Sequence, residues 1–287
     1  MEKVSLYIPC FNAEKYIKEC LDSIRGQSYK IDEIIVIDDG STDSSFDIFK
    51  NYPVKIIRNL ENKGLAACRN IAFKEAKNQF VAALDADCVA GALWLAELMK
   101  CFVSEDIAGA GGILIERYTS NVADKWRSVH MVQQWGAEIL EDPPFLYGNN
   151  TLFRKEPLTK VGFYNEKYKT NYEDVDISMR LYDSGFSLIY NPKAQVEHIR
   201  KDTIISILLT HWSWRYYSHK NQMCTNKGFR KLALKIGCIG GYTGDFLRED
   251  IQEKKYNLLV IDFIAIFYCY WLSLKDCFKE LLSWEAR

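Results

Sequence analysis

Four short apolar segments that alternate with helix-like stretches are the feature that most limits how this chain can fold. The segments cover residues 4–9, 34–37, 54–57 and 80–84. Between them, the stretch 13–27 has apolar residues at helical spacing, and the stretch 65–77 is rich in alanine. Such an alternation of strands and helices predicts an α/β fold, with a mostly parallel, Rossmann-like sheet and helices on both faces.

Two acidic pairs follow strands of this predicted sheet. Asp85 and Asp87 come directly after residues 80–84, and Asp38 and Asp39 end the second strand. Ligands of open α/β sheets bind at the carboxyl ends of the strands, so both pairs are expected at one edge. Neighbouring carboxylates repel each other unless a cation lies between them, and oxygen ligands suit Mg²⁺ or Mn²⁺. The alternatives are solvated turns and, around Asp43, a helix cap.

A third acidic group opens a predicted helix that runs to about residue 183. Glu173, Asp174 and Asp176 are favourably placed against the positive end of a helix dipole. A carboxylate in this position can also serve as a general base. Farther along the chain, His198 is either a structural histidine or, as a neutral imidazole, a metal ligand beside Asp87.

The composition and the N-terminus bear on the partner, the state of the cysteines and the location of the protein. The 287-residue chain has a net charge of −1, which argues against a nucleic-acid partner. It has nine cysteines but no Cys-x-x-Cys pair, so we expect reduced thiols in the core, as in Cys68, Cys88 and Cys238. The N-terminus enters a strand without a signal-like segment, and we therefore expect a cytoplasmic protein.

The composition changes after about residue 201. Aromatic residues such as Trp212 and Trp214 precede the basic residues His219, Lys220, Lys227, Arg230, Lys231 and Lys235. The apolar run 258–274 is shorter than the roughly 20 residues of a membrane span and contains Asp262. We expect residues 202–287 to form a helical region that contacts the cytoplasmic membrane surface, forms a homodimer or packs on a catalytic domain of residues 1–201.

Several motifs occur in a characteristic order. They are Ile8-Pro9-Cys10-Phe11-Asn12, residues 23–29, Ile37-Asp38-Asp39-Gly40-Ser41-Thr42-Asp43, residues 62–70, Asp85-Ala86-Asp87 and residues 173–180, with His198 downstream. This set resembles family 2 glycosyltransferases, which have the nucleotide-sugar-binding GT-A fold. The resemblance covers roughly residues 4–201.

The resemblance implies an inverting enzyme that moves a sugar from a nucleotide-diphosphate sugar, with UDP favoured, to an acceptor hydroxyl. The acceptor would be a glycan, a lipid-linked saccharide or a protein, in cell-surface polysaccharide synthesis. Asp174 would be the catalytic base. Mn²⁺ or Mg²⁺ would be held by Asp87 and His198, with Asp85 reaching the metal or the ribose.

The remaining implied roles concern the two ends of the donor. The nucleotide side would be formed by Pro9, Asn12, Asp38, Asp39, Arg69 and Asp85. The donor sugar and the acceptor would meet Asn149, Asn150 and Glu173.

Some positions depart from the family pattern. Phe11 stands where tyrosine is common, and residues 162–166 read Gly-Phe-Tyr-Asn-Glu instead of Gly-Gly-Phe-Asp-Glu. The Gln-x-x-Arg-Trp signature of processive synthases is absent, which favours transfer of a single sugar. A catalytically inactive sugar-nucleotide binder and a nucleotidyltransferase remain as alternatives. The latter usually begins with a Gly-rich basic loop, which residues 6–15 lack, and a dehydrogenase would need Gly-x-Gly-x-x-Gly.

Overall fold

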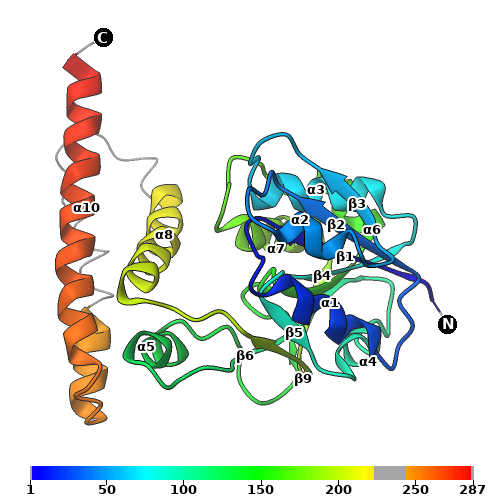
Figure 1. The fold of residues 1–287 in the computed structure, drawn as a ribbon, viewed down its shortest axis with the longest axis horizontal. Coiled ribbons are helices and arrows are strands. Elements are labelled where there is room, and N and C mark those ends of the chain that lie inside the picture. The colour runs from blue at the N-terminus through cyan, green and yellow to red at the C-terminus, as the bar shows by residue number, and fades with distance from the viewer. Residues whose placement is uncertain (1, 223–243, 286–287) are drawn as a thin grey trace. The chain divides into compact units, whose positions relative to one another are not determined.

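The computed structural model describes residues 2–222 and 244–285, and it divides the chain into two compact units (Figure 1). The first unit contains the chain up to Arg117 together with Gln133–Arg200. The second contains Tyr118–Val132 and the chain from Lys201 onward. The two units meet in the sequence at Arg200 and Lys201, and the segment Tyr118–Val132 belongs to the C-terminal unit.

A nine-stranded sheet forms the centre of the first unit. Its strands are β1 (Val4–Cys10), β2 (Glu33–Asp38), β3 (Lys55–Arg58), β4 (Phe80–Leu84), β5 (Cys88–Ala90), β6 (Ile107–Glu116), β7 (Leu140–Glu141), β8 (Asn150–Arg154) and β9 (Ser187–His198). Their order is β3-β2-β1-β4-β8-β6-β9-β5, with β7 paired to β9. Within the described residues β5, β7 and β8 are antiparallel to the other strands, so the sheet is mostly parallel.

Helices cover both faces of this sheet, as predicted. They are α1 (Ile17–Arg25), α2 (Ser45–Phe49), α3 (Leu65–Glu75), α4 (Trp94–Met99), α6 (Lys155–Lys160) and α7 (Glu173–Asp183). Because side chains alternate along a strand, Leu6 and Ile8 of β1 pack with α1 and α4, whereas Tyr7 packs with α3, α6 and α7. Figure 1 shows these two helical layers on opposite sides of the strands.

Strand register brings the predicted motifs to one edge. Leu84 of β4 pairs with Asn150 of β8, so Asp85 follows beside Asn149. Cys88 of β5 pairs with His198 of β9, which places Asp87 next to the end of β9. Segments more than 60 positions apart in the sequence therefore meet where β4 ends.

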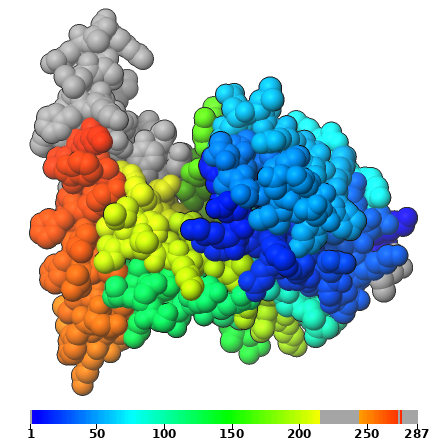
Figure 2. All heavy atoms as spheres, viewed as in Figure 1, coloured from blue at the N-terminus to red at the C-terminus, as the bar shows by residue number. Residues whose placement is uncertain are grey.

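The second unit is helical. It contains α5 (Val122–His130), α8 (Ile204–Gln222), a helical segment at residues 244–252 and α10 (Leu259–Glu285). Trp126, Ile207 and Ile261 belong to its buried core. Figure 2 shows α8 in yellow packed against α10 in orange. Among the described helices, none combines the length and apolar character needed to cross a membrane.

The sequence pattern also predicts a helix at residues 124–140, strands at 186–190 and 194–198, and Asn12 as the cap of the helix at 13–27. These local predictions were wrong for reasons of packing. The helix expected at residues 124–140 ends at His130, because the chain returns to the first unit, where the Leu114 amide donates to the Gln133 carbonyl. The two strands expected at 186–190 and 194–198 are one continuous strand, β9. Asn12 does not cap α1; instead its side-chain oxygen accepts from the Thr42 amide at 2.8 Å.

The cysteine prediction is confirmed for the described residues. Six cysteines there are buried thiols outside any disulfide, namely Cys10, Cys20, Cys68, Cys88, Cys101 and Cys269. Cys238 and the basic residues Lys227, Arg230, Lys231 and Lys235 lie outside the described residues, and nothing is described for the side chains of His219 and Lys220.

Candidate active site

The Asp85-Ala86-Asp87 turn is held by backbone hydrogen bonds from both neighbouring segments. The Asp85 amide donates to the Asn149 carbonyl at 3.3 Å, and the Ile199 amide donates to the Asp87 carbonyl at 2.9 Å. The side chains of Asp85 and Asp87 are 25% and 28% exposed, so solvent reaches both carboxylates. The turn is therefore anchored by its backbone while its acidic side chains remain accessible.

His198 lies beside Asp87, as the sequence suggested. Its Nε2 atom is 3.3 Å from Oδ2 of Asp87, and its Nδ1 atom is 2.7 Å from Oε2 of Glu116. Burial lowers the pKa of His198, but the carboxylates of Asp87 and Glu116 outweigh this effect and raise the pKa to about 9. This arrangement fits a divalent metal. Nε2 of His198 and Oδ2 of Asp87 are the nearby donor atoms, and the Glu116 carboxylate holds the other ring nitrogen.

Asp85 is directed to a different partner, the guanidinium group of Arg69. Arg69 is 1% exposed, and its nitrogens lie 3.6 Å from carboxylate oxygens of both Asp85 and Glu173. It also donates to the Tyr7 hydroxyl at 3.1 Å and to the Gly148 carbonyl at 2.6 Å. Burial raises the pKa of Asp85 to about 6, with Arg69 acting in the opposite direction. Arg69 thus lies behind the acidic groups and connects them.

Gly148 marks how closely the chain approaches Arg69. A Cβ atom at this position would lie 2.7 Å from Nη2 of Arg69, which is closer than real contacts allow. A side chain at residue 148 would therefore force the Arg69 guanidinium to move.

Glu173 and Asp174 open α7 beside this loop. Asp174 accepts hydrogen bonds from the amide of Val175 at 2.8 Å and from that of Gly148 at 3.3 Å. Burial raises the pKa of both carboxyls, and the charge of Asp174 further raises the pKa of Glu173. Glu173 is only 3% exposed, whereas Asp174 is half-buried. Asp174 is therefore the carboxylate of this pair that a substrate can reach.

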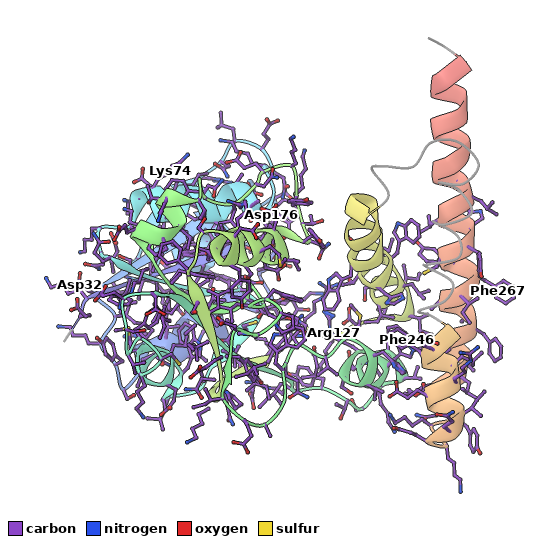
Figure 3. All side chains as sticks on the ribbon, turned by 180° about the vertical axis from the view of Figure 1, so that it is seen from behind. Asp32, Lys74, Arg127, Asp176, Phe246 and Phe267 are labelled. Atoms are coloured by element: carbon purple, nitrogen blue, oxygen red, sulfur yellow. The ribbon has the colours of Figure 1, made fainter. Side chains whose placement is uncertain are left out.

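The third acidic residue of this motif has a structural partner. Asp176 forms an ion pair with Arg180 one turn later in α7, at 2.6 Å. Figure 3 labels Asp176 on this helix. Of the two interpretations of the acidic cluster, a structural role or a general base, the structural one therefore applies to Asp176.

Asp38 and Asp39 lie at the end of β2, and both carboxylates hold nearby loops. Asp38 accepts from the Ser41 amide at 2.9 Å and lies 3.0 Å from Nε of Arg58. Asp39 accepts from the Asn59 side chain at 2.7 Å and from the amides of residues 63 and 64 at 2.9 Å. Pro9 is buried in β1 beside them. Asp43 accepts from the Ser45 amide at 3.0 Å, which forms an Asx-turn directly before α2, whose N-cap position is Ser44.

The two asparagines predicted to contact sugars differ sharply. Asn149 donates to the Gln133 side chain at 2.6 Å, while its buried Oδ1 has no hydrogen-bond partner among the described residues. Asn150 is fully buried, accepts from the Trp94 indole and donates to the carbonyls of residues 113 and 194. These bonds connect the Asn150 side chain to α4, β6 and β9, and its contact with a sugar stays a prediction.

Sequence reasoning missed two further groups near the site. Glu116 is the carboxylate on His198, and it ends a strand 82 positions earlier. Trp135 stacks on Tyr147 with ring centres 5.4 Å apart, and Phe145 packs edge-on against both. This half-buried cluster lies next to the base candidate, because Tyr147 precedes Gly148, whose amide donates to Asp174. Burial and the nearby Asp174 raise the pKa of Tyr147. No periodicity in the sequence signals either group.

Comparison with known proteins supports the same family. The family model described as Glycosyl transferase family 2 matches residues 5–162, more than half of the chain. EpsE of Bacillus subtilis (strain 168), named as a glycosyltransferase, is 28% identical over 211 residues, covering 70% of this chain and 74% of EpsE. The poly-beta-1,6-N-acetyl-D-glucosamine synthase of Staphylococcus epidermidis is 26% identical over 293 aligned residues, covering 98% of this chain and 65% of the synthase.

Solved structures share the fold at lower identity. The mannosyltransferase PcManGT from Pyrobaculum calidifontis, in complex with GDP-Man and Mn²⁺, superposes with a TM-score of 0.58 at 16% identity, covering 99% of this chain and 79% of the other. GalNAc-T7 with UDP, GalNAc and Mn²⁺ gives a TM-score of 0.57 at 19% identity, covering 70% and 44%. Together with the family match, these results show that the chain is a glycosyltransferase of family 2 with the GT-A fold.

Proposed function

We propose that this protein is an inverting glycosyltransferase that adds a single sugar from a nucleotide-diphosphate donor, with UDP as the carrier, to an acceptor hydroxyl. The observation that carries this proposal is the meeting of Asp87, His198 and Asp174 at one sheet edge. The relatives named as glycosyltransferases, and the polysaccharide synthase among them, support a role in synthesis of a cell-surface glycan.

Asp87 and His198 would hold a divalent cation, Mn²⁺ or Mg²⁺. Such a cation neutralises the charge that develops on a departing diphosphate. Glu116 would fix the orientation of the His198 ring through its 2.7 Å contact, and Asp85 would lie beside the ribose or the outer coordination sphere. The protein's own part is to present these donors from rigid strand ends.

Asp174 would act as the base. As the acceptor oxygen bonds to the anomeric carbon, the bond between that carbon and the diphosphate oxygen breaks, and the hydroxyl proton passes to the Asp174 carboxylate. Attack opposite the leaving group inverts the configuration. The two amides that bind Asp174 hold the carboxylate in position throughout.

The buried Arg69 would position these groups rather than bind the donor directly. Arg69 contacts Asp85 on the side of the proposed metal and Glu173 on the side of the proposed base. It also contacts the loop at Gly148, which lies between them. Asp39 would shape the nucleoside side by holding the 62–64 turn, with Pro9, Asn12 and Asp38 around it. Asn149 Oδ1 and the ring of Trp135 would meet the sugars.

The second unit would bring the enzyme to the cytoplasmic membrane surface and to a lipid-linked acceptor. Val260, Phe263, Phe267 and Trp271 recur at helical spacing on α10, and each is at least half exposed. Figure 3 shows Phe267 projecting from α10 on the side away from α8. An exposed apolar stripe of this kind suits insertion at a membrane interface, while a second copy of the chain is the alternative partner.

A donor screen with a base variant tests the proposed reaction. Purified protein with Mn²⁺ is given a panel of UDP-, GDP- and other nucleotide sugars, and hydrolysis and thermal shift are measured. We expect one donor to be hydrolysed, and Asp174→Asn to lose transfer by about 10²–10⁴-fold while still being stabilised by that donor. Asp183→Asn, at the exposed end of the same helix, is the matched control.

Three results would contradict the proposal. Near-normal turnover by Asp174→Asn would rule out Asp174 as the base, and full activity after exhaustive chelation would rule out a catalytic metal. A product ladder of many sugars from one acceptor would replace single transfer by polymerisation.

A further inference from the structure

A second cluster of metal-ligating side chains lies inside the helical unit. His130 ends α5, Asp250 belongs to the helical segment 244–252, and Asp262 lies in the first turn of α10. Each offers one ligand atom, and these atoms all lie within 4.8 Å of one another. All three residues belong to the same unit, which is not the one that contains Asp87 and His198.

The cluster is almost completely shielded from solvent. Asp250 and Asp262 have no exposed surface, and the His130 side chain is 1% exposed. The ring of Phe246 covers His130 with ring centres 4.4 Å apart, and the Trp126 ring lies 5.0 Å away. Two carboxylates in such a dry, aromatic setting are strongly destabilised unless a positive charge compensates them.

The polar atoms of the cluster are only half satisfied. Trp126 donates its indole N–H to Oδ1 of Asp262 at 2.7 Å, and Nε2 of His130 lies 2.9 Å from Oδ2 of Asp250. The remaining atoms, His130 Nδ1, Asp250 Oδ1 and Asp262 Oδ2, are buried without a hydrogen-bond partner in the described part of the chain. Buried oxygen and nitrogen acceptors without donors are the atoms that a bound cation would satisfy.

We propose that His130, Asp250 and Asp262 form a structural divalent-cation site, with Zn²⁺ as the best match. One imidazole nitrogen and carboxylate oxygens are ordinary zinc ligands. The indole N–H of Trp126 orients the Asp262 carboxylate, as outer partners do at metal sites. The cation joins three helical segments. His130 of α5 lies 120 positions before Asp250 in the sequence. The cation therefore stabilises the association of α5 with the C-terminal helices.

The competing arrangement is a proton shared between Asp250 and Asp262. The two arrangements make different predictions for the full-length protein, because only a metal site responds to added zinc. The Asp87→Asn background removes the other proposed cation site, so that the two sites are not confused.

The experiment measures zinc in the Asp87→Asn protein after treatment with a chelator, titration with Zn²⁺ and gel filtration. We expect one equivalent of zinc to be retained, the thermal midpoint to rise and the tryptophan emission to change because Trp126 contacts a ligand. Adding His130→Gln or Asp262→Asn should weaken zinc binding by at least about tenfold, as loss of a donor does at metal sites. Asp245→Asn, an exposed acidic residue of the same helical segment, should change nothing.

Failure to retain zinc in a folded Asp87→Asn protein would overturn the proposal, and this measurement needs no variant of the cluster. A variant Asp262→Asn that melts higher with no response to zinc would assign the site to a shared proton. Because the Asp87→Asn protein is expected to lack transferase activity, zinc retention without activity separates this site from the proposed catalytic one.

Discussion

Nε2 of His198 lies 3.3 Å from Oδ2 of Asp87, while Nδ1 of the same ring lies 2.7 Å from Oε2 of Glu116. The imidazole is therefore held between a carboxylate on a loop and a carboxylate at the end of β6. A histidine that ligates a metal through one nitrogen usually bonds a carboxylate through the other, and this bond fixes the ring orientation.

We predict that Glu116→Gln weakens activation by Mn²⁺ without abolishing it. Loss of an outer carboxylate should raise the Mn²⁺ concentration for half-maximal activity by about 10–100-fold. Metal titration of the initial rate measures this change. Glu197→Gln, next to His198 but exposed and paired with Arg117, is the matched control. An unchanged titration curve for Glu116→Gln would show that Glu116 does not support a metal ligand.

We predict an acid limit of catalysis above the ordinary aspartate range. Burial raises the pKa of Asp174, so the carboxyl is protonated at pH values where an exposed aspartate, with a pKa of about 4, is ionised. A protonated base cannot accept the acceptor proton, so kcat should fall as the pH falls through this raised pKa. The measurement is a pH profile of kcat at saturating donor and Mn²⁺. An acid limb at or below about pH 4 would contradict it.

We predict that Arg69→Met is severely destabilising. Arg69 is 1% exposed and lies beside Asp85 and Glu173, so its removal leaves the buried Glu173 carboxylate and the partly buried Asp85 carboxylate without this cation. Breaking a buried ion pair in this way lowers the free energy of unfolding by about 3–5 kcal/mol. Urea unfolding measures the loss, and Lys55→Met, at an exposed ion pair with Glu75, should change little. Equal stabilities of the two variants would argue that Arg69 is not a positioning residue.

We predict that the exposed stripe of α10 binds anionic phospholipid vesicles. Phe267 and Trp271 are 73% and 55% exposed, and burying such side chains gains roughly 1.5–3 kcal/mol each. The double variant Phe267→Ser/Trp271→Ser should therefore be depleted from the floated fraction at least tenfold. Leu60→Ser, a fully exposed apolar residue of the first unit, should float like the wild type. Wild-type protein that stays with the soluble fraction and elutes as a dimer would favour a second copy as the partner.

Local pattern was sufficient to predict much of the fold. The apolar segments at β1, β2 and β4 are nearly continuous runs, as expected for parallel strands buried on both faces, and residues 13–27 have apolar positions at helical spacing. The parallel half of the sheet could therefore be predicted directly. The shared location of the acidic residues at the ends of β2 and β4 could also be predicted, because the carboxyl ends of parallel strands lie at one edge of a sheet. The short strands β5 and β7 have three and two residues, too few for any periodicity.

Tertiary packing decided how the candidate residues are used. Asn150 and Arg69 have polar side chains suited to a ligand, yet both point into the interior and are bonded there, because the antiparallel pairing of β8 with β4 buries this region. Glu116 reaches His198 only through the parallel pairing of β6 with β9. The cluster of His130, Asp250 and Asp262 depends on helices that are adjacent in space and distant in sequence. The sequence determined which chemical groups follow which strands, and the long-range contacts determined which of those groups remain free to act.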